Sequence, residues 1–137
     1  MSVEFDRSII GSEFDRTVFG PVTVENILEY IAVTGETEPP ASPADLVAPP
    51  TFVVCVRGHR FMPKNVAGVR SGFDAGKDIE FGVPVRPGDV LTSVSTVHDI
   101  YEKTGRSGSM AFVVLRTVVT NQRGEQVAVV DQRMMFR

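Results

Sequence analysis

The residue types that could bind a charged ligand are concentrated near the middle of the chain. Arg57, Arg60, Lys64 and Arg70 form a basic stretch with no acidic residue among them, and His59 lies inside it. Guanidinium and ammonium groups bind phosphates and carboxylates, so the stretch is a candidate site for an anionic ligand such as a phosphate-bearing carrier. The alternative is solvated surface, where most Lys and Arg side chains lie.

Other reactive side chains give weaker signals. Cys55 lies in an apolar run with no His near it in sequence and is predicted to be a buried, inert thiol. His98 and Asp99 are neighbours in a predicted strand, so we expect them on opposite faces and not as a catalytic pair. Two His and one Cys form no metal-ligand cluster, and no phosphate-binding glycine motif is present. We therefore expect no metal and no cofactor.

Length and composition predict one soluble domain over residues 1–137, since 42% of the residues are hydrophobic and 23% charged. No apolar run reaches the roughly 18 residues of a membrane helix, and no secretory signal is recognisable. With a single Cys, a cytoplasmic location is expected. The net charge is −3, with −7 in residues 1–48 and +4 in the remainder, which argues against nucleic acid as the main partner.

The first half of the chain predicts one helix and a proline-rich loop. A first strand is expected over residues 17–22, ended by Gly20-Pro21, and an amphipathic helix over 24–34 with Thr23 as N-cap and Gly35 just past its end. Five prolines make 36–50 a loop. The run 51–56 reads as a strand by propensity, but Pro49-Pro50 before it is also a helix-start signal.

The second half predicts an antiparallel meander. Short strands are expected on either side of a turn at 76–78, and a type II turn over 86–89. Long strands are then expected at 91–101, 110–120 and 126–136, separated by a loop at 102–109 and a turn at 121–124. The strand 110–120 is apolar on both faces, which predicts a central strand. The class is α+β, an antiparallel sheet wrapped around a central helix.

Two motifs resemble a known family. The first motif resembles the strand–turn–strand segment of MaoC-type hot-dog dehydratases and reads Phe81-x-x-Pro84-Val85-x-Pro87-Gly88-Asp89-x-Leu91. The second resembles the hairpin of their N-terminal, FAS1-like branch and reads Tyr101-Glu102-Lys103-x-Gly105-Arg106-Ser107-Gly108. The helix 24–34 and the segment 48–52 match that branch in order and spacing, and the resemblance runs from about Val3 to Phe136.

The resemblance implies a fold, a substrate class and an assembly. Residues 51–58 would form the buried central helix, with Phe52, Val53 and Val56 in the core. Two hot-dog domains would pair as a homo- or heterodimer. The substrates would be acyl thioesters of coenzyme A or acyl carrier protein, and the reaction the reversible hydration of a trans-2-enoyl thioester to the (R)-3-hydroxyacyl form in fatty-acyl metabolism.

The chain departs from the catalytic pattern of this family. The family's Gly-Asp-x-Asn-Pro-x-His falls on residues 35–41, where Glu36 replaces the Asp and Ala41 replaces the His. Its His-Gly pair at the start of the central helix reads Pro49-Pro50, and proline has no N–H to hold a carbonyl oxygen. The resemblance therefore implies a non-catalytic subunit that completes the acyl tunnel of a partner bearing Asp and His.

Two other functions stay open. Glu36 could be the lone carboxylate base of a self-sufficient hot-dog thioesterase, or an exposed loop acid. The chain could also be a non-enzymatic acyl-thioester-binding dimer. In each case the basic stretch would follow the central helix, near the family's tunnel mouth. There it would bind a coenzyme A phosphate or an acidic carrier protein through Arg57, His59, Arg60 and Lys64.

Overall fold

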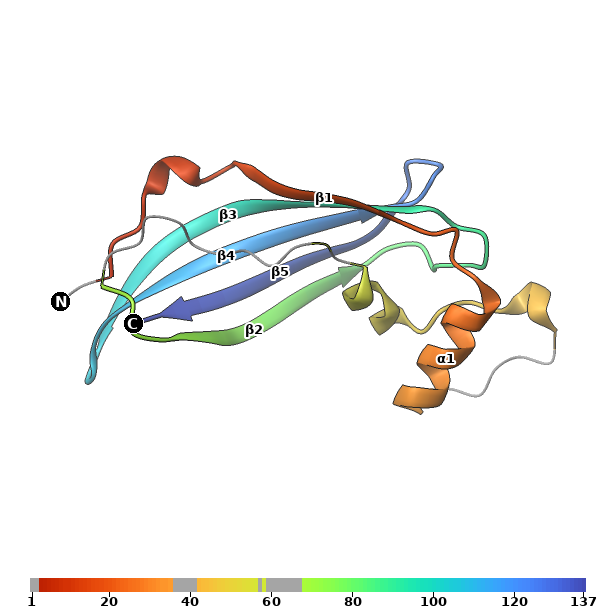
Figure 1. Ribbon diagram of the computed structural model, residues 1–137, viewed down its shortest axis with the longest axis horizontal. Helices are drawn as coiled ribbons and strands as arrows, with labels where there is room; N and C mark the ends of the chain where they lie inside the picture. Colours follow the sequence, from red (N-terminus) through yellow and green to blue (C-terminus); the bar gives the residue numbers. More distant parts are fainter. Residues whose placement is uncertain (1–2, 36–41, 57, 59–67) are drawn as a thin grey trace.

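One antiparallel sheet of five strands forms most of the molecule (Figure 1). A computed structural model describes residues 3–35, 42–56, 58 and 68–137. The strand order is β1-β3-β4-β5-β2, so β1 and β2 are the two edges. The strands are β1 (Glu13–Phe19), β2 (Gly72–Phe81), β3 (Leu91–Gly105), β4 (Gly108–Thr120) and β5 (Gln126–Phe136). The helical elements are α1 (Val24–Thr34) and the short 3-10 helices η1 (Arg7–Ile9), η2 (Pro43–Asp45) and η3 (Pro50–Cys55).

The meander of β3, β4 and β5 confirms the predicted hot-dog sheet, with one difference at its first hairpin. The loop expected at 102–109 is wrong, because β3 continues to Gly105 and β4 begins at Gly108. The strands stay paired because Tyr101 stacks on Phe112, with ring centroids 5.0 Å apart, and Lys103 lies 5.7 Å from both rings. Cross-strand aromatic and cation–π contacts of this kind stabilise a hairpin beyond its turn.

The edge strands also differ from expectation. β1 begins at Glu13 and ends at Phe19, before Gly20-Pro21. The turn expected at 76–78 is wrong, because β2 is one strand whose register shifts between Asp74 and Lys77. Gly76 has a φ of 109° and donates its N–H to Asp74 Oδ1 at 2.9 Å, so the glycine forms a bulge within the strand.

β4 occupies the middle of the sheet, as its apolar pattern predicts. On one face of the strand Val113 and Val119 are at 0% exposure. On the other face Phe112, Val114 and Val118 are only half-buried. The concave face therefore carries the core, and the expectation of full burial on both faces is wrong for this chain.

The helix α1 has the caps that its sequence predicts. The Thr23 side chain accepts a hydrogen bond from the Asn26 N–H, and the Asn26 side chain accepts one from the Thr23 N–H, both at 3.0 Å. Gly35 takes a left-handed conformation and donates its N–H to Ile31. Ile27 and Ile31 are buried in the core.

The segment predicted as the central helix folds as η3, shorter than the expected range 51–58. Its β-branched Val residues disfavour a longer α-helix, and its bonds span three residues, such as Phe52 N–H to Pro49 O at 2.9 Å. Phe52, Val53 and Val56 are buried, as expected. Cys55 is exposed, so its predicted burial is wrong.

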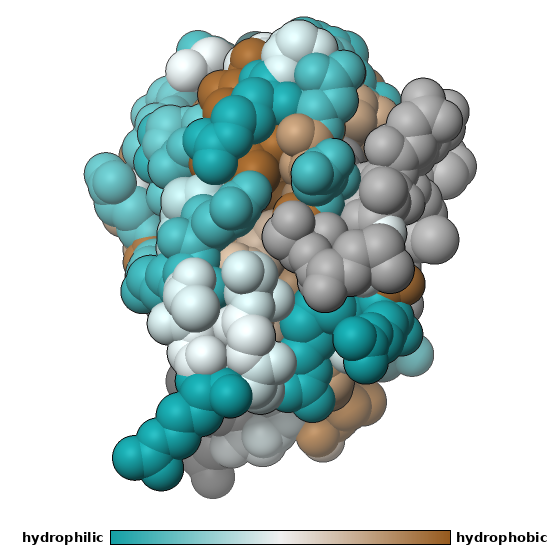
Figure 2. Space-filling model, turned by 90° about the vertical axis from the view of Figure 1, so that its left-hand side faces the viewer, coloured by the Kyte–Doolittle hydropathy of each residue, from teal (hydrophilic) through white to brown (hydrophobic). Residues whose placement is uncertain are grey.

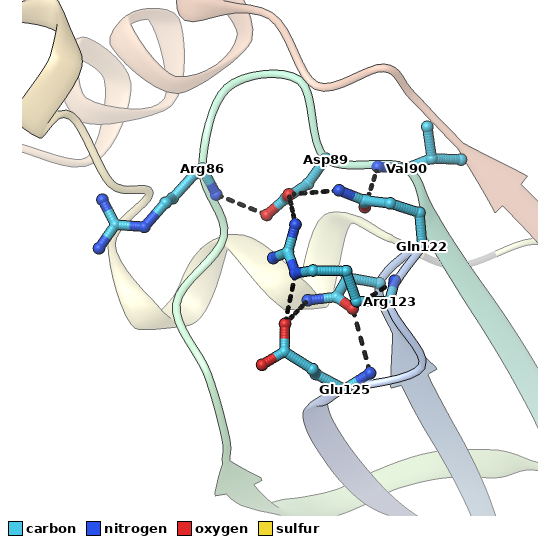
Figure 3. Close-up of polar contacts among 7 residues, drawn as sticks. Arg86, Asp89, Val90, Gln122, Arg123 and Glu125 are labelled. Carbon is cyan, nitrogen blue, oxygen red and sulfur yellow. Dashed lines mark hydrogen bonds and ion pairs between the residues drawn. The ribbon is translucent and has the colours of Figure 1, made fainter.

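The turn over 86–89 forms as predicted and fixes neighbouring loops (Figure 3). The Asp89 N–H donates to the Arg86 carbonyl at 3.1 Å. The buried Asp89 carboxylate accepts hydrogen bonds from the Arg86 N–H at 2.9 Å and from Gln122 Nε2 at 3.0 Å. Gln122 Oε1 in turn accepts the Val90 N–H, and Arg123 lies 3.5 Å from Asp89. The Pro-Gly-Asp motif thus joins the β2–β3 connection to the β4–β5 turn.

Candidate functional site

A cavity of about 380 Å³ lies between the concave face of the sheet and η3. Members of two hydrophobic clusters line it, one cluster around α1 and η3 and one around Val3, Val113 and Phe136. Its apolar walls are formed by Phe14, Val53, Val54, Val56, Leu115, Val130 and Met134. A volume of this size holds a small organic ligand.

The position of η3 over the sheet is set by contacts with α1. Tyr30 Oη lies 2.7 Å from Thr51 Oγ1, and the Tyr30 ring meets Phe52 edge-on with centroids 5.5 Å apart. Phe19 of β1 adds a second edge contact to Phe52. These contacts fix the beginning of η3, while Val53 and Val56 close the cavity from above.

The beginning of η3 offers few hydrogen-bond donors. Pro49 is the N-cap residue without a side-chain cap, and Pro50 is the first residue of the helix. Neither residue has a backbone N–H, so neither position can hold a carbonyl oxygen. The structure thus keeps the two prolines at the helix start where the resemblance expects a donor.

Polar side chains line the floor and one rim of the cavity. On the floor Ser95 of β3 and Thr117 of β4 face each other, with their hydroxyl oxygens 2.8 Å apart. At the β2 edge Gln132 Nε2 donates to Asp74 Oδ2 at 3.0 Å, and Lys77 Nζ lies 3.9 Å from the same oxygen. The cavity therefore has a neutral hydroxyl pair inside and a mixed charged rim.

A buried carboxylate lies beside the floor on β1. Asp15 pairs with Ser95 across the sheet, is 9% exposed, and its Oδ2 accepts the Thr17 hydroxyl at 2.9 Å. The backbone of Gly58 lies directly against both side chains, because an added Cβ would be 2.1 Å from Asp15 Oδ2 and from Thr17 Oγ1. Only glycine fits this close approach, which fixes the chain just after η3.

Most of the candidate site residues named from the sequence lie outside the residues that the structure describes. Glu36, Arg57, His59, Arg60 and Lys64 lie outside the described residues. The described residues bring together no group of three potential metal ligands. No described helix is both long enough and apolar enough to cross a membrane.

The prediction for His98 and Asp99 rested on regular alternation, which the structure contradicts. The register of β3 against β4 shifts between Val97 and Asp99, and both His98 and Asp99 are exposed. The Asp99 carboxylate accepts the N–H of Ile100 at 2.8 Å. His98 lies near Asp131 instead and contributes to lowering the pKa of that carboxyl, after the larger effect of Arg116.

The sequence reasoning missed the polar residues of the cavity. In β3 the order Leu91, Ser93, Ser95, Val97 places two serines between two apolar residues on one face. This alternation predicts that the two serine hydroxyls lie on the buried face of the strand. The partner Thr117 needs the register of β3 against β4, which the sequence alone does not provide.

Apolar surface is also visible at the end of the molecule that carries the termini. Seen from that end, apolar residues lie in a hollow between hydrophilic ones (Figure 2).

Comparison with known proteins identifies what the fold is similar to. Residues 8–130 match the family described as FAS1-like, dehydratase domain region. A UPF0336 protein of Streptomyces griseus is 29% identical over 147 aligned residues, covering 96% of this chain and 95% of that protein. The sheet and helices also match the structure of the HadBC (3R-hydroxyacyl-ACP dehydratase) complex of Mycobacterium tuberculosis, with 25% identity, a TM-score of 0.60, and coverage of 90% and 92%. The R-hydratase PhaJ1 of Pseudomonas aeruginosa matches at 18% identity with a TM-score of 0.66, covering 98% of this chain and 87% of that one.

Proposed function

Because the chain belongs to the FAS1-like dehydratase domain family of MaoC hot-dog proteins, we propose that it is a subunit of an (R)-specific 2-enoyl thioester hydratase or 3-hydroxyacyl thioester dehydratase. In this proposal it houses the acyl chain, and a second hot-dog chain supplies the catalytic Asp and His. Two observations support the proposal: an acyl-sized cavity against the end of η3, and a start of the same helix that offers no backbone N–H at Pro49 or Pro50.

The chemistry of hydration explains why a partner is needed. Water adds to the β-carbon with a base to activate it, an acid to protonate the α-carbon, and donors for the thioester oxygen. Ala41 cannot transfer a proton, and the two prolines cannot donate from their backbone. The similarity to the HadBC complex supports assembly with a second hot-dog chain.

The basic residues have a role in the same proposal. Arg57, His59, Arg60 and Lys64 would bind the phosphate of coenzyme A or the acidic surface of a carrier protein. They follow η3 in sequence, and Gly58 between them is held against Asp15 and Thr17 beside the cavity.

The test is hydration of crotonyl-coenzyme A, followed by loss of the enoyl absorbance. The purified chain alone is expected to be inactive while its circular dichroism shows a folded sheet. Addition of a co-purifying hot-dog chain with the Asp–His motif is expected to give turnover. Turnover by the chain alone would overturn the proposal, and Glu36 and His59 would then be the residues to substitute.

A further inference from the structure

The floor of the cavity carries two hydroxyl groups, with which an apolar ligand could not form hydrogen bonds. Ser95 and Thr117 are paired across β3 and β4, and Ser95 is only 5% exposed. Their neighbours Leu115 and Val130 are apolar, and the Asp15 carboxylate, opposite Ser95 on β1, accepts the Thr17 hydroxyl. Among the described residues that line the cavity, the hydroxyl pair is therefore the polar point away from the charged rim at β2.

A count of hydrogens shows that this pair has a donor left over. Each hydroxyl carries one hydrogen, and the 2.8 Å contact between Ser95 Oγ and Thr117 Oγ1 uses only one of the two. Neither hydroxyl makes a second hydrogen bond within the described part of the chain. Ser93, two residues earlier on the same face, is fully buried, and its Oγ also has no partner in the described part of the chain.

The groups at the rim do not compete for this donor. The acceptor at the rim, the Asp74 carboxylate, already accepts hydrogen bonds from the Gln132 amide and the Gly76 N–H and faces Lys77. A plain hydrocarbon chain on the floor would leave the hydroxyl hydrogen unpaired, which disfavours binding, whereas an oxygen atom on the chain would accept it.

We propose that the cavity selects acyl groups bearing an oxygen substituent, a hydroxyl or a carbonyl beyond the reacting carbons, over plain hydrocarbon chains. This inference rests on the proposed function, because it takes the ligand to be an acyl thioester. Ser95 and Thr117 are then the residues that determine the choice of acyl chain.

The experiment measures binding of pantetheine thioesters by calorimetry, since pantetheine is common to coenzyme A and acyl carrier protein. The probes are decanoyl-pantetheine and its isomers with one hydroxyl at successive positions along the chain. At least one isomer is expected to bind about tenfold more tightly than the unsubstituted probe. Replacing both floor hydroxyls, with Ser95→Ala and Thr117→Val, is expected to remove this preference and keep the affinity for decanoyl-pantetheine.

The matched control is Thr96→Val on the outer face of β3, which is expected to keep the preference. Chemical denaturation establishes that each variant is folded. Equal affinity for all probes, or a preference that survives the double substitution, overturns this inference and leaves the proposed function standing. Failure of every thioester to bind contradicts the proposed function itself.

Discussion

The carboxylate of Asp89 is 4% exposed and accepts hydrogen bonds from two different loops. A buried charge is stable only when it is paired and hydrogen-bonded, and here the Arg86 N–H, Gln122 and Arg123 provide those partners. The Pro-Gly-Asp motif by which the sequence resembles its family thus stabilises the fold and lies outside the lining of the cavity.

Asp89→Ala is expected to lower the free energy of unfolding by about 2–3 kcal/mol, because the Arg86 N–H and the Gln122 amide lose their buried, charged acceptor. Urea denaturation measures the change. The matched control is Glu102→Ala, an exposed carboxylate on β3, which is expected to stay within about 0.5 kcal/mol of the wild type. Equal stability of the Asp89 variant and the control would contradict the structural role of the motif.

Single residues also mark where sequence reasoning succeeds. Thr23 and Gly35 were predictable as helix caps because capping depends on a few neighbouring residues. Ser95 and Thr117 come together only through the pairing of two strands, and Cys55 is exposed because η3 turns its side chain away from the core. Contacts set by local chemistry could be read from the sequence, and contacts set by register could not.

At the scale of elements, the strand β5 was predicted with its observed bounds, Gln126–Phe136, because a turn precedes it and the apolar pattern is continuous. β2 was divided wrongly at Gly76, since glycine is typical of turns and of bulges alike. The bulge at His98 in β3 has no such sequence marker. The presence of a strand can thus be predicted from its own residues, while the position of a bulge depends on pairing with the neighbouring strand.

The outer face of β4 and β5 carries an ion pair whose effect depends on pH. Arg116 donates to both carboxylate oxygens of Asp131 at 2.8 Å, which holds the pKa of Asp131 below its ordinary value. A carboxyl with a lowered folded-state pKa adds stability above its unfolded pKa, about 3.9, and this contribution is lost as the pH falls through the folded value.

The stability difference between the wild type and Asp131→Asn is therefore expected to be constant near neutral pH and to shrink below about pH 4. Denaturant midpoints across this range measure it. Asp45→Asn is the control, since the Asp45 carboxyl has no basic partner among the described residues. A difference that does not change with pH would show that the pair contributes through packing alone.

At the scale of the whole molecule, the sheet has two edges that differ in character. The β2 edge carries Phe73 and Phe81, 44% and 49% exposed, and its Lys77 and Asp74 form the rim of the cavity. The β1 edge carries one large exposed apolar side chain, Val18. Unpaired strand edges with apolar side chains favour association, so we expect the second hot-dog chain of the proposed assembly to bind at the β2 edge.

Phe81→Lys is expected to weaken assembly with the proposed Asp–His-bearing chain by about tenfold or more, because it places a charge in the contact. Val18→Lys makes the same change at the β1 edge and is expected to leave assembly unchanged. Analytical ultracentrifugation of mixtures gives the affinity, and crotonyl-coenzyme A hydration by the same mixtures gives the activity. If both variants assemble like the wild type, the partner does not use β2. If activity falls with assembly only in Phe81→Lys, the cavity rim and the catalytic residues of the partner share one interface.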